Sequence, residues 1–282
     1  MFLHGTQAVN EKGHLTIGGC DTVELAETYG TPTIVYDIAL FKERAQGFVD
    51  TFESLGVNAQ VAYASKAYSS VAIYQLAETL GLSLDVVSEG ELYTAVKAGF
   101  PREKIHFHGN NKSESEIRYA FEQRIGCIVL DNFYEIDLVR SIARELDQSM
   151  NVLIRVTPGV EASTHIYITT GQEDSKFGFD LNNGQADRAF QSLKDDEQLQ
   201  LLGMHVHIGS QIFEVDGFVK AAEALMHKMD VWRQEEGFVC SVLNLGGGFG
   251  IRYTEEDTPQ EPSYYVKEMT EAVMRLASSI DY

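Results

Sequence analysis

Short apolar runs alternate along the chain with stretches whose apolar residues recur at helical spacing. Each run is too short for a helix and predicts a buried strand, whereas the intervening stretches carry apolar positions three or four residues apart. The expected strands are 61–66, 83–88, 104–109, 127–131, 151–156, 201–208 and 242–246. Strands separated by helices form right-handed βαβ units, so we expect them to pair in parallel.

The stretches between the strands predict helices. Apolar stripes cover 73–80, 218–232 and 265–276, and Ser113 with Glu116 has the spacing of a capping box, which marks a helix start. At this spacing we interpret the stripes as core packing.

Seven consecutive units favour a (β/α)8-type barrel over an open doubly wound sheet. The expected fold class is α/β, an incomplete barrel with seven of eight strands, because the chain ends after the seventh helix. Such a barrel leaves two sheet edges unpaired, which invites association. Gly, Asp and Asn residues mark 157–184 as a structured loop between the fifth and sixth strands.

The amino-terminal part does not follow this repeat. The segment 14–19 predicts a short strand, 32–37 a second strand, and about 40–55 a helix. We therefore expect two parts, residues 1–38 as a segment that belongs to a partner β domain and residues 39–282 as the barrel.

Charge narrows the range of partners. The 282 residues include 22 Lys or Arg and 42 Asp or Glu, a formal net charge of −20, which argues against nucleic acid or an anionic membrane surface as partner. The first residues lack the pattern of a secretion signal, and no apolar run approaches the ~18 residues that cross a bilayer. The three cysteines are far apart and form no CxxC pair. We expect a cytoplasmic protein with no metal site.

Chemistry in a parallel barrel gathers where the strands end at their carboxyl edge. In this sequence every predicted strand ends in polar or glycine residues: Ser65 and Lys66, Asp85 and Ser88, His108 to Asn110, Asp131 and Asn132, Arg155, His205 and His207, and Gly246 to Gly248. Together these ends predict a functional site at that edge.

Lys66 ends the first barrel strand. A lysine at that place inside a barrel is partly desolvated, which favours the neutral amine, and a neutral amine can form an imine with an aldehyde. From spacing alone, an exposed lysine at the start of a loop is the better interpretation.

The other strand ends allow more than one interpretation. The glycines of 246–250 can close around a phosphate or form a tight turn, and Ile251 rules out the dinucleotide fingerprint. His205 and His207 face the same side but lack a third zinc ligand. We interpret His207 as a ring over a planar cofactor, and His205 as a core histidine. Arg155 needs an anionic or hydrogen-bonding partner because burial of a lone guanidinium is costly.

Taken together, the motifs of this chain resemble those of the diaminopimelate decarboxylases, which belong to the alanine-racemase-like (fold type III) pyridoxal-phosphate enzymes. The motifs are YASKAY at 63–68, DVVSEGEL at 85–92, FHGNNK at 107–112, KFGFD at 176–180, HVHIGSQ at 205–211 and LGGGFG at 245–250. The resemblance covers essentially the whole chain and corresponds to the amino-terminal portion of the family, without its carboxy-terminal β domain.

The resemblance implies a role for each matching residue. It makes Lys66 the catalytic residue that carries pyridoxal 5'-phosphate, His207 the ring that stacks on the cofactor, and Asp85 and Arg155 the floor of the site. Ser210, Gly246, Gly247 and Gly248 are implied near the phosphate. The implied reaction is decarboxylation of meso-diaminopimelate to L-lysine and CO2, the last step of lysine biosynthesis, in a homodimer.

The sequence departs from the family in one respect. A Glu-Pro-Gly-Arg motif on the eighth strand, and a Cys-Glu-Ser motif and a tyrosine in the β domain, do not occur in it, since Glu261 and Pro262 are followed by Ser and Tyr. We therefore expect little or no decarboxylase activity from the 282-residue chain alone, although Lys66 can still bind the cofactor.

Two alternatives stay open. The first is a related decarboxylase of ornithine, arginine or a carboxylated polyamine, which shares the lysine, histidine and glycine elements. The second is a non-catalytic binding or regulatory protein on the same fold, against which the retained Lys66 argues.

Overall fold

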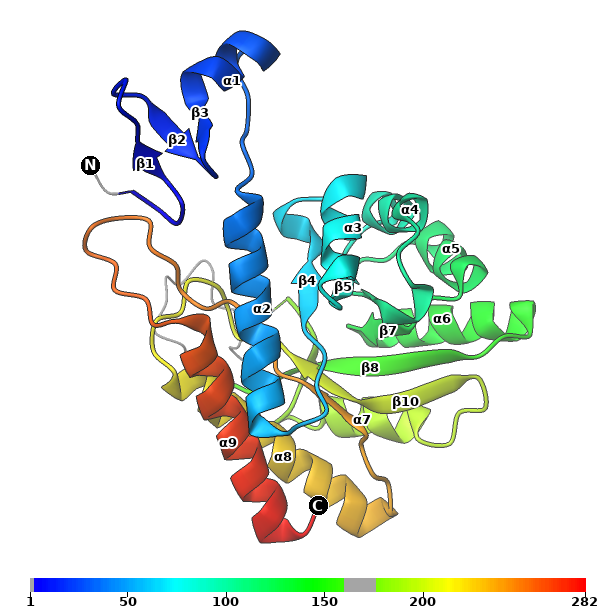
Figure 1. Ribbon diagram of the computed structural model, residues 1–282. Helices are drawn as coiled ribbons and strands as arrows, with labels where there is room; N and C mark the ends of the chain where they lie inside the picture. The colour runs from blue at the N-terminus through cyan, green and yellow to red at the C-terminus, as the bar shows by residue number, and fades with distance from the viewer. Residues whose placement is uncertain (1–2, 160–175) are drawn as a thin grey trace.

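The main part of the molecule is a curved parallel sheet with helices on its outer face, seen in a computed structural model that describes residues 3–159 and 176–282 (Figure 1). The sheet runs in the order β11-β10-β8-β7-β6-β5-β4, and β9 pairs with β8 beside this path. Its strands are β4 (Ala62–Ala64), β5 (Ser83–Val86), β6 (Ile105–Phe107), β7 (Cys127–Leu130), β8 (Met150–Thr157), β9 (Phe179–Asp180), β10 (Leu199–Val206) and β11 (Val242–Asn244). Each pairing is parallel.

All seven predicted barrel strands are present, so the incomplete α/β barrel is confirmed. Strand β9 was not predicted, because two residues are too short to show an alternating pattern. It lies inside the expected loop 157–184, of which residues 160–175 lie outside the described residues.

Helices follow the strands in turn. They are α3 (Val71–Thr79), α4 (Glu89–Ala98), α5 (Glu114–Gln123), α6 (Phe133–Leu146), α7 (Gln185–Leu193), α8 (Asp216–Glu236) and α9 (Pro262–Ile280), with short 3-10 helices at Ser65–Ala67 and Arg102–Lys104. The helices α3 to α6 begin where a Ser or Asn side chain accepts a backbone N–H of the first turn, and these caps are Ser70, Ser88, Ser113 and Asn132. The predicted capping box of Ser113 and Glu116 is confirmed.

The amino-terminal part forms a small antiparallel sheet with one helix, and it lies apart from the barrel (Figure 1). Its elements are β1 (Ala8–Val9), β2 (Leu15–Ile17), β3 (Cys20–Asp21) and α1 (Thr22–Tyr29). The strand predicted at 14–19 is confirmed by β2, whereas the strand predicted at 32–37 is wrong. That stretch runs as irregular chain with Ile34, Val35 and Tyr36 exposed, so its apolar residues do not mark a paired, buried strand.

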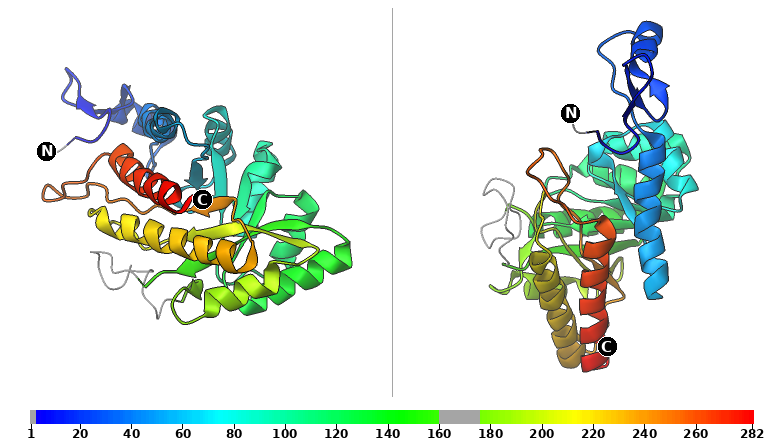
Figure 2. Two further views of the ribbon diagram at one scale, coloured as in Figure 1. Left: turned by 90° about the horizontal axis from the view of Figure 1, so that it is seen from below. Right: turned by 60° about the vertical axis from the view of Figure 1, so that its left-hand side comes forward.

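Helices bring the first and last units of the barrel together. The helix predicted at about 40–55 is α2 (Ile38–Leu55), and α9 packs against both α2 and α8 (Figures 1 and 2). Strands β4 and β11 form the two ends of the sheet path, and their residues are more exposed than those of the strands between them. Among the helices of the described residues, none is long and apolar enough to span a membrane.

Candidate functional site

Lys66 lies directly after β4, in the 3-10 helix at the carboxyl edge of the barrel. The side chain is exposed, as the interpretation from spacing alone favoured, and the alternative of a partly desolvated lysine inside the barrel does not describe it. The barrel mouth is open beside β4, because β4 is the last strand of the sheet path. Lys66 is therefore within reach of a molecule that enters from solvent.

His207, just beyond β10, lies within electrostatic range of both Arg155 and Lys66. Burial, and then the positive charges of Arg155 and Lys66, lower the pKa of His207 to about 3. The ring is therefore neutral at physiological pH, which suits it to stack on a flat cofactor without adding charge. The structure thus brings together three of the residues that the sequence analysis singled out.

The glycine turn after β11 lies against the turn that follows His207. The Ile212 N–H donates to the Gly248 carbonyl at 3.0 Å, and the Gly250 N–H donates to the Ile212 carbonyl at 2.7 Å. Ser210 is an exposed residue of the turn that follows His207. The two turns therefore bring Ser210 and the predicted phosphate-binding glycines together.

These turns approach so closely that two of the glycines have no room for a side chain. A Cβ on Gly248 would come 1.9 Å from the Gly209 carbonyl oxygen and 3.3 Å from Cε1 of His207, and one on Gly246 would come 2.3 Å from the Val206 carbonyl oxygen. The outcome is a cradle of backbone beside the His207 ring, which fits a phosphate and an attached planar ring.

This close approach predicts a contrast between neighbouring glycines. We expect Gly248→Ala to lower the free energy of unfolding by about 2 kcal/mol or more, because it combines a clash with a positive φ of 103°. Gly247→Ala should change little, since a Cβ there meets nothing within 4 Å. Urea unfolding followed by circular dichroism measures both variants, and equal losses for the two would contradict this account of the turn.

Asp85, on β5, is held between two imidazoles of the neighbouring strand and its following loop. Its Oδ1 lies 3.2 Å from Nδ1 of His106 and 3.3 Å from Nε2 of His108. Burial acts to raise the pKa of Asp85, but His108 and His106 outweigh it and hold that pKa well below its usual value. Asp85 is therefore an anion at the centre of a histidine cluster.

The cluster continues across the barrel to His205. The rings of His108 and His205 meet edge to face, with centroids 4.7 Å apart. His205 is buried, and burial is the main cause that lowers its pKa well below the usual value. It therefore behaves as the neutral core histidine that the sequence analysis expected.

Arg155 has the anionic partner that its position on β8 required. Its guanidinium lies 3.7 Å from Oδ2 of Asp131, and its Cζ lies 4.3 Å from the centre of the Phe177 ring. Asp85 and Arg155 thus contact separate partners and belong to two different polar groups.

Sequence reasoning named His108 and Asp131 as strand ends but gave neither a role, and it did not single out His106. The two-residue spacing of His106 and His108 could have indicated this cluster. Side chains two residues apart in extended chain face the same side, and His106 lies opposite Asp85 of the neighbouring strand. The partner of Arg155 had no such signal, because it depends on which strand lies next to β8.

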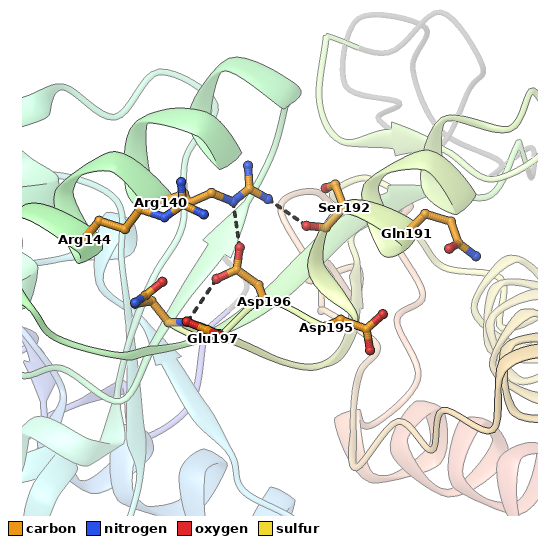
Figure 3. A pocket seen from close by; sticks show the side chains of 8 residues that line it. Arg140, Arg144, Gln191, Ser192, Asp195, Asp196 and Glu197 are labelled. Atoms are coloured by element: carbon orange, nitrogen blue, oxygen red, sulfur yellow. Dashed lines mark hydrogen bonds and ion pairs between the residues drawn. The ribbon is translucent and has the colours of Figure 1, made fainter.

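A surface hollow of about 680 Å³ lies at the opposite edge of the barrel (Figure 3). It is formed where α6 and α7 meet the residues that precede β10, and Arg140 there donates to Asp196 at 2.6 Å and to the Ser192 carbonyl at 2.7 Å. Because it lies at the amino end of β10, this hollow is distant from the strand ends that carry Lys66 and His207.

The chain belongs to the family described as "Pyridoxal-dependent decarboxylase, pyridoxal binding domain", whose model matches residues 39–281. Pyridoxal phosphate is the cofactor of this class, and the geometry of Lys66, His207 and the glycine cradle fits it.

Within this class, the chain is similar in sequence to proteins named diaminopimelate decarboxylase, so the resemblance seen in the motifs is confirmed. It is 64% identical over 278 residues to the protein of Bacillus subtilis (strain 168) and 61% identical over 279 residues to that of Bacillus methanolicus. Each match covers 99% of this chain, but only 63% and 65% of those relatives.

Solved structures give the same picture. The crystal structure of diaminopimelate decarboxylase from M. jannaschii in complex with L-lysine matches with a TM-score of 0.87 and 33% identity, over 98% of this chain and 63% of that one. The enzyme from Helicobacter pylori, also in complex with L-lysine, matches with a TM-score of 0.83 and 30% identity, over 90% of this chain and 63% of that one.

Proposed function

We propose that this chain carries pyridoxal 5'-phosphate on Lys66 and contributes the cofactor-binding barrel of an enzyme that decarboxylates meso-diaminopimelate to L-lysine and CO2. The observation that supports this most directly is the gathering of Lys66, the neutral His207 ring and the glycine cradle at one end of the barrel.

Each residue would make a distinct contribution. When bound, pyridoxal phosphate supplies an electron sink for the charge left behind when CO2 departs. Lys66 would hold the cofactor's aldehyde carbon, the His207 ring would cover one face of its pyridine ring, and the turns at 207–211 and 246–250 would enclose its phosphate. Arg155 adds a positive charge beside His207. It would thereby favour anionic groups of cofactor or substrate at this edge.

Asp85 would place a negative charge on the floor of the cofactor site. Its Oδ1 lies 3.2 Å from Nδ1 of His106 and 3.3 Å from Nε2 of His108, so the two rings would hold the carboxylate in one orientation. We expect this cluster to orient groups rather than to bind a metal, because no group of three or more metal-binding side chains is found among the described residues.

The choice of substrate rests on the named relatives, and product analysis tests it. We expect a fusion of these 282 residues to the part of the Bacillus subtilis relative outside the match to release L-lysine from meso-diaminopimelate when loaded with pyridoxal phosphate. Putrescine from ornithine or agmatine from arginine as the main product would favour the related decarboxylases instead. Failure to bind pyridoxal phosphate would favour a non-catalytic protein. The same assay on the 282-residue chain alone tests the expectation of little turnover.

We further propose a homodimer in the cytoplasm, with residues 1–38 as part of a β domain and 39–282 as the barrel. The separate small sheet at the amino terminus supports the division. Three cysteines without disulfides fit a reducing compartment. Sedimentation of the fusion protein measures its oligomeric state.

A further inference from the structure

A group of charged side chains joins the ends of β6, β7 and β8 on one side of the barrel mouth. Its centre is Asp131, which follows β7 and is 3% exposed. One carboxylate oxygen, Oδ1, accepts the Gly178 N–H at 2.9 Å, and the other, Oδ2, lies 3.7 Å from the Arg155 guanidinium. A single carboxylate therefore connects β7 to the arginine of β8 and to the segment 176–180 that leads into β9.

The end of β7, where Asp131 lies, is held in place by the buried ion pair of Lys112 and Glu135. The Glu135 carboxylate, in the first turn of α6, accepts a hydrogen bond from the ammonium of Lys112 at 2.7 Å. Lys112 gives its other two N–H groups to the carbonyls of Gly109 and Val129, at 2.8 and 2.7 Å. The ammonium is thus fully bonded, and it holds the end of β7 against the loop after β6.

The guanidinium of Arg155 is confined by this arrangement from two directions. The Phe177 ring covers it at 4.3 Å, and the Thr157 hydroxyl holds the Phe177 carbonyl at 2.6 Å, which keeps the ring in place. Gly178 is also required here, because a Cβ at that position would come 2.8 Å from the Arg155 carbonyl oxygen. The Asp131 carboxylate provides the negative charge that pairs with the guanidinium.

We propose that Asp131 is a positioning residue that fixes the Arg155 guanidinium beside His207, so that Arg155 meets the anionic group of the bound cofactor or substrate in one orientation. The proposal rests on the proposed function for the identity of that anion. The placement of Arg155 by Asp131 does not depend on it.

The first test uses no cofactor. Arg155 reacts with phenylglyoxal at a rate that peptide mass spectrometry measures, and Asp131→Asn should raise that rate at least fivefold, because the amide keeps a bond to Gly178 but no longer holds the charge. Arg44, on the exposed face of α2, gives the internal reference rate. Asp137→Asn is the matched control, since Asp137 is an exposed carboxylate of α6 that pairs with Arg140. An unchanged rate at Arg155 would overturn the proposal whatever the cofactor.

The second test asks whether Asp131 acts through Arg155. Titration with pyridoxal phosphate, followed by absorbance, should show about tenfold weaker binding for Asp131→Asn than for the unmodified chain. The same substitution in an Arg155→Gln background should have no further effect. If Asp131→Asn weakens pyridoxal phosphate binding equally in both backgrounds, Asp131 acts by supporting the fold alone, and this result contradicts the proposal.

Two further results complete the design. Asp131→Glu keeps the charge, so it should lose less affinity than Asp131→Asn. If Asp131→Asn fails to unfold cooperatively, Asp131→Ala, which also removes the charge, replaces it in both tests. If the unmodified chain binds no pyridoxal phosphate, the proposed function fails, while the phenylglyoxal rates still decide the role of Asp131.

Discussion

Replacement of Lys66 by alanine is expected to abolish the stable attachment of pyridoxal phosphate to this chain. The unmodified chain should develop an absorbance band at about 420 nm on addition of the cofactor, as a protonated imine of pyridoxal phosphate does. Lys66→Ala should show no such band and should release the cofactor on gel filtration, because no amine remains at the strand end. In the fusion protein, lysine formation should fall on the order of a thousandfold or more.

Lys112, near the same edge, cannot take over this role. The Lys112 ammonium is bonded to three acceptors and its side chain is 1% exposed, so it is neither free nor accessible. The matched control is Lys97→Ala, which removes an exposed lysine from α4 and should leave the band unchanged. Lys66→Arg keeps the positive charge but forms no stable imine. If the absorbance band survives in Lys66→Ala, Lys66 is not the lysine that binds the cofactor.

Much of the fold could be predicted because a barrel strand is buried on both faces. The four residues of β7 are all buried, and such a strand appears in the sequence as an unbroken apolar run. The helices were equally visible from their apolar stripes and from caps such as Ser113. The error at 32–37 has the converse cause, since apolar residues there are exposed and the sequence pattern alone cannot tell a buried run from an exposed one.

In the site, too, residues at strand ends or in motifs could be predicted from the sequence, whereas contacts between separate elements could not. Lys66, His207 and Gly246 to Gly248 could be named because each lies at a strand end or in a recognisable motif. The exposure of Lys66 agrees with the interpretation of its spacing as the start of a loop, and its cause is that β4 is the end of the sheet path. Lys112 lies in a polar stretch and Glu135 near the start of an amphipathic helix, yet they form a buried pair. Tertiary contacts between three elements decide that pairing.

That buried pair leads to the largest expected loss of stability. Lys112→Met should lower the free energy of unfolding by about 3–5 kcal/mol near pH 8, because it leaves the Glu135 carboxylate buried without its partner. Lys112→Met with Glu135→Leu should recover most of the loss, since no charge is then left behind. Lys194→Met is the control, because Lys194 forms its ion pair with Glu236 on the surface, where the effect of losing a pair is small.

The loss should depend on pH in one direction. Burial raises the pKa of Glu135 to about 6 in the native chain, against the restraining charge of Lys112. Removal of that charge raises the pKa further, so in Lys112→Met the carboxyl takes up a proton more readily in the folded state than in the unfolded state. A carboxyl with a raised folded pKa stabilises the fold at low pH, and this contribution is lost as pH rises through the folded value. Urea unfolding should therefore show a smaller loss at pH 5 than at pH 8, and an equal loss at both would mean that Lys112 stabilises the barrel by its carbonyl bonds rather than by its charge.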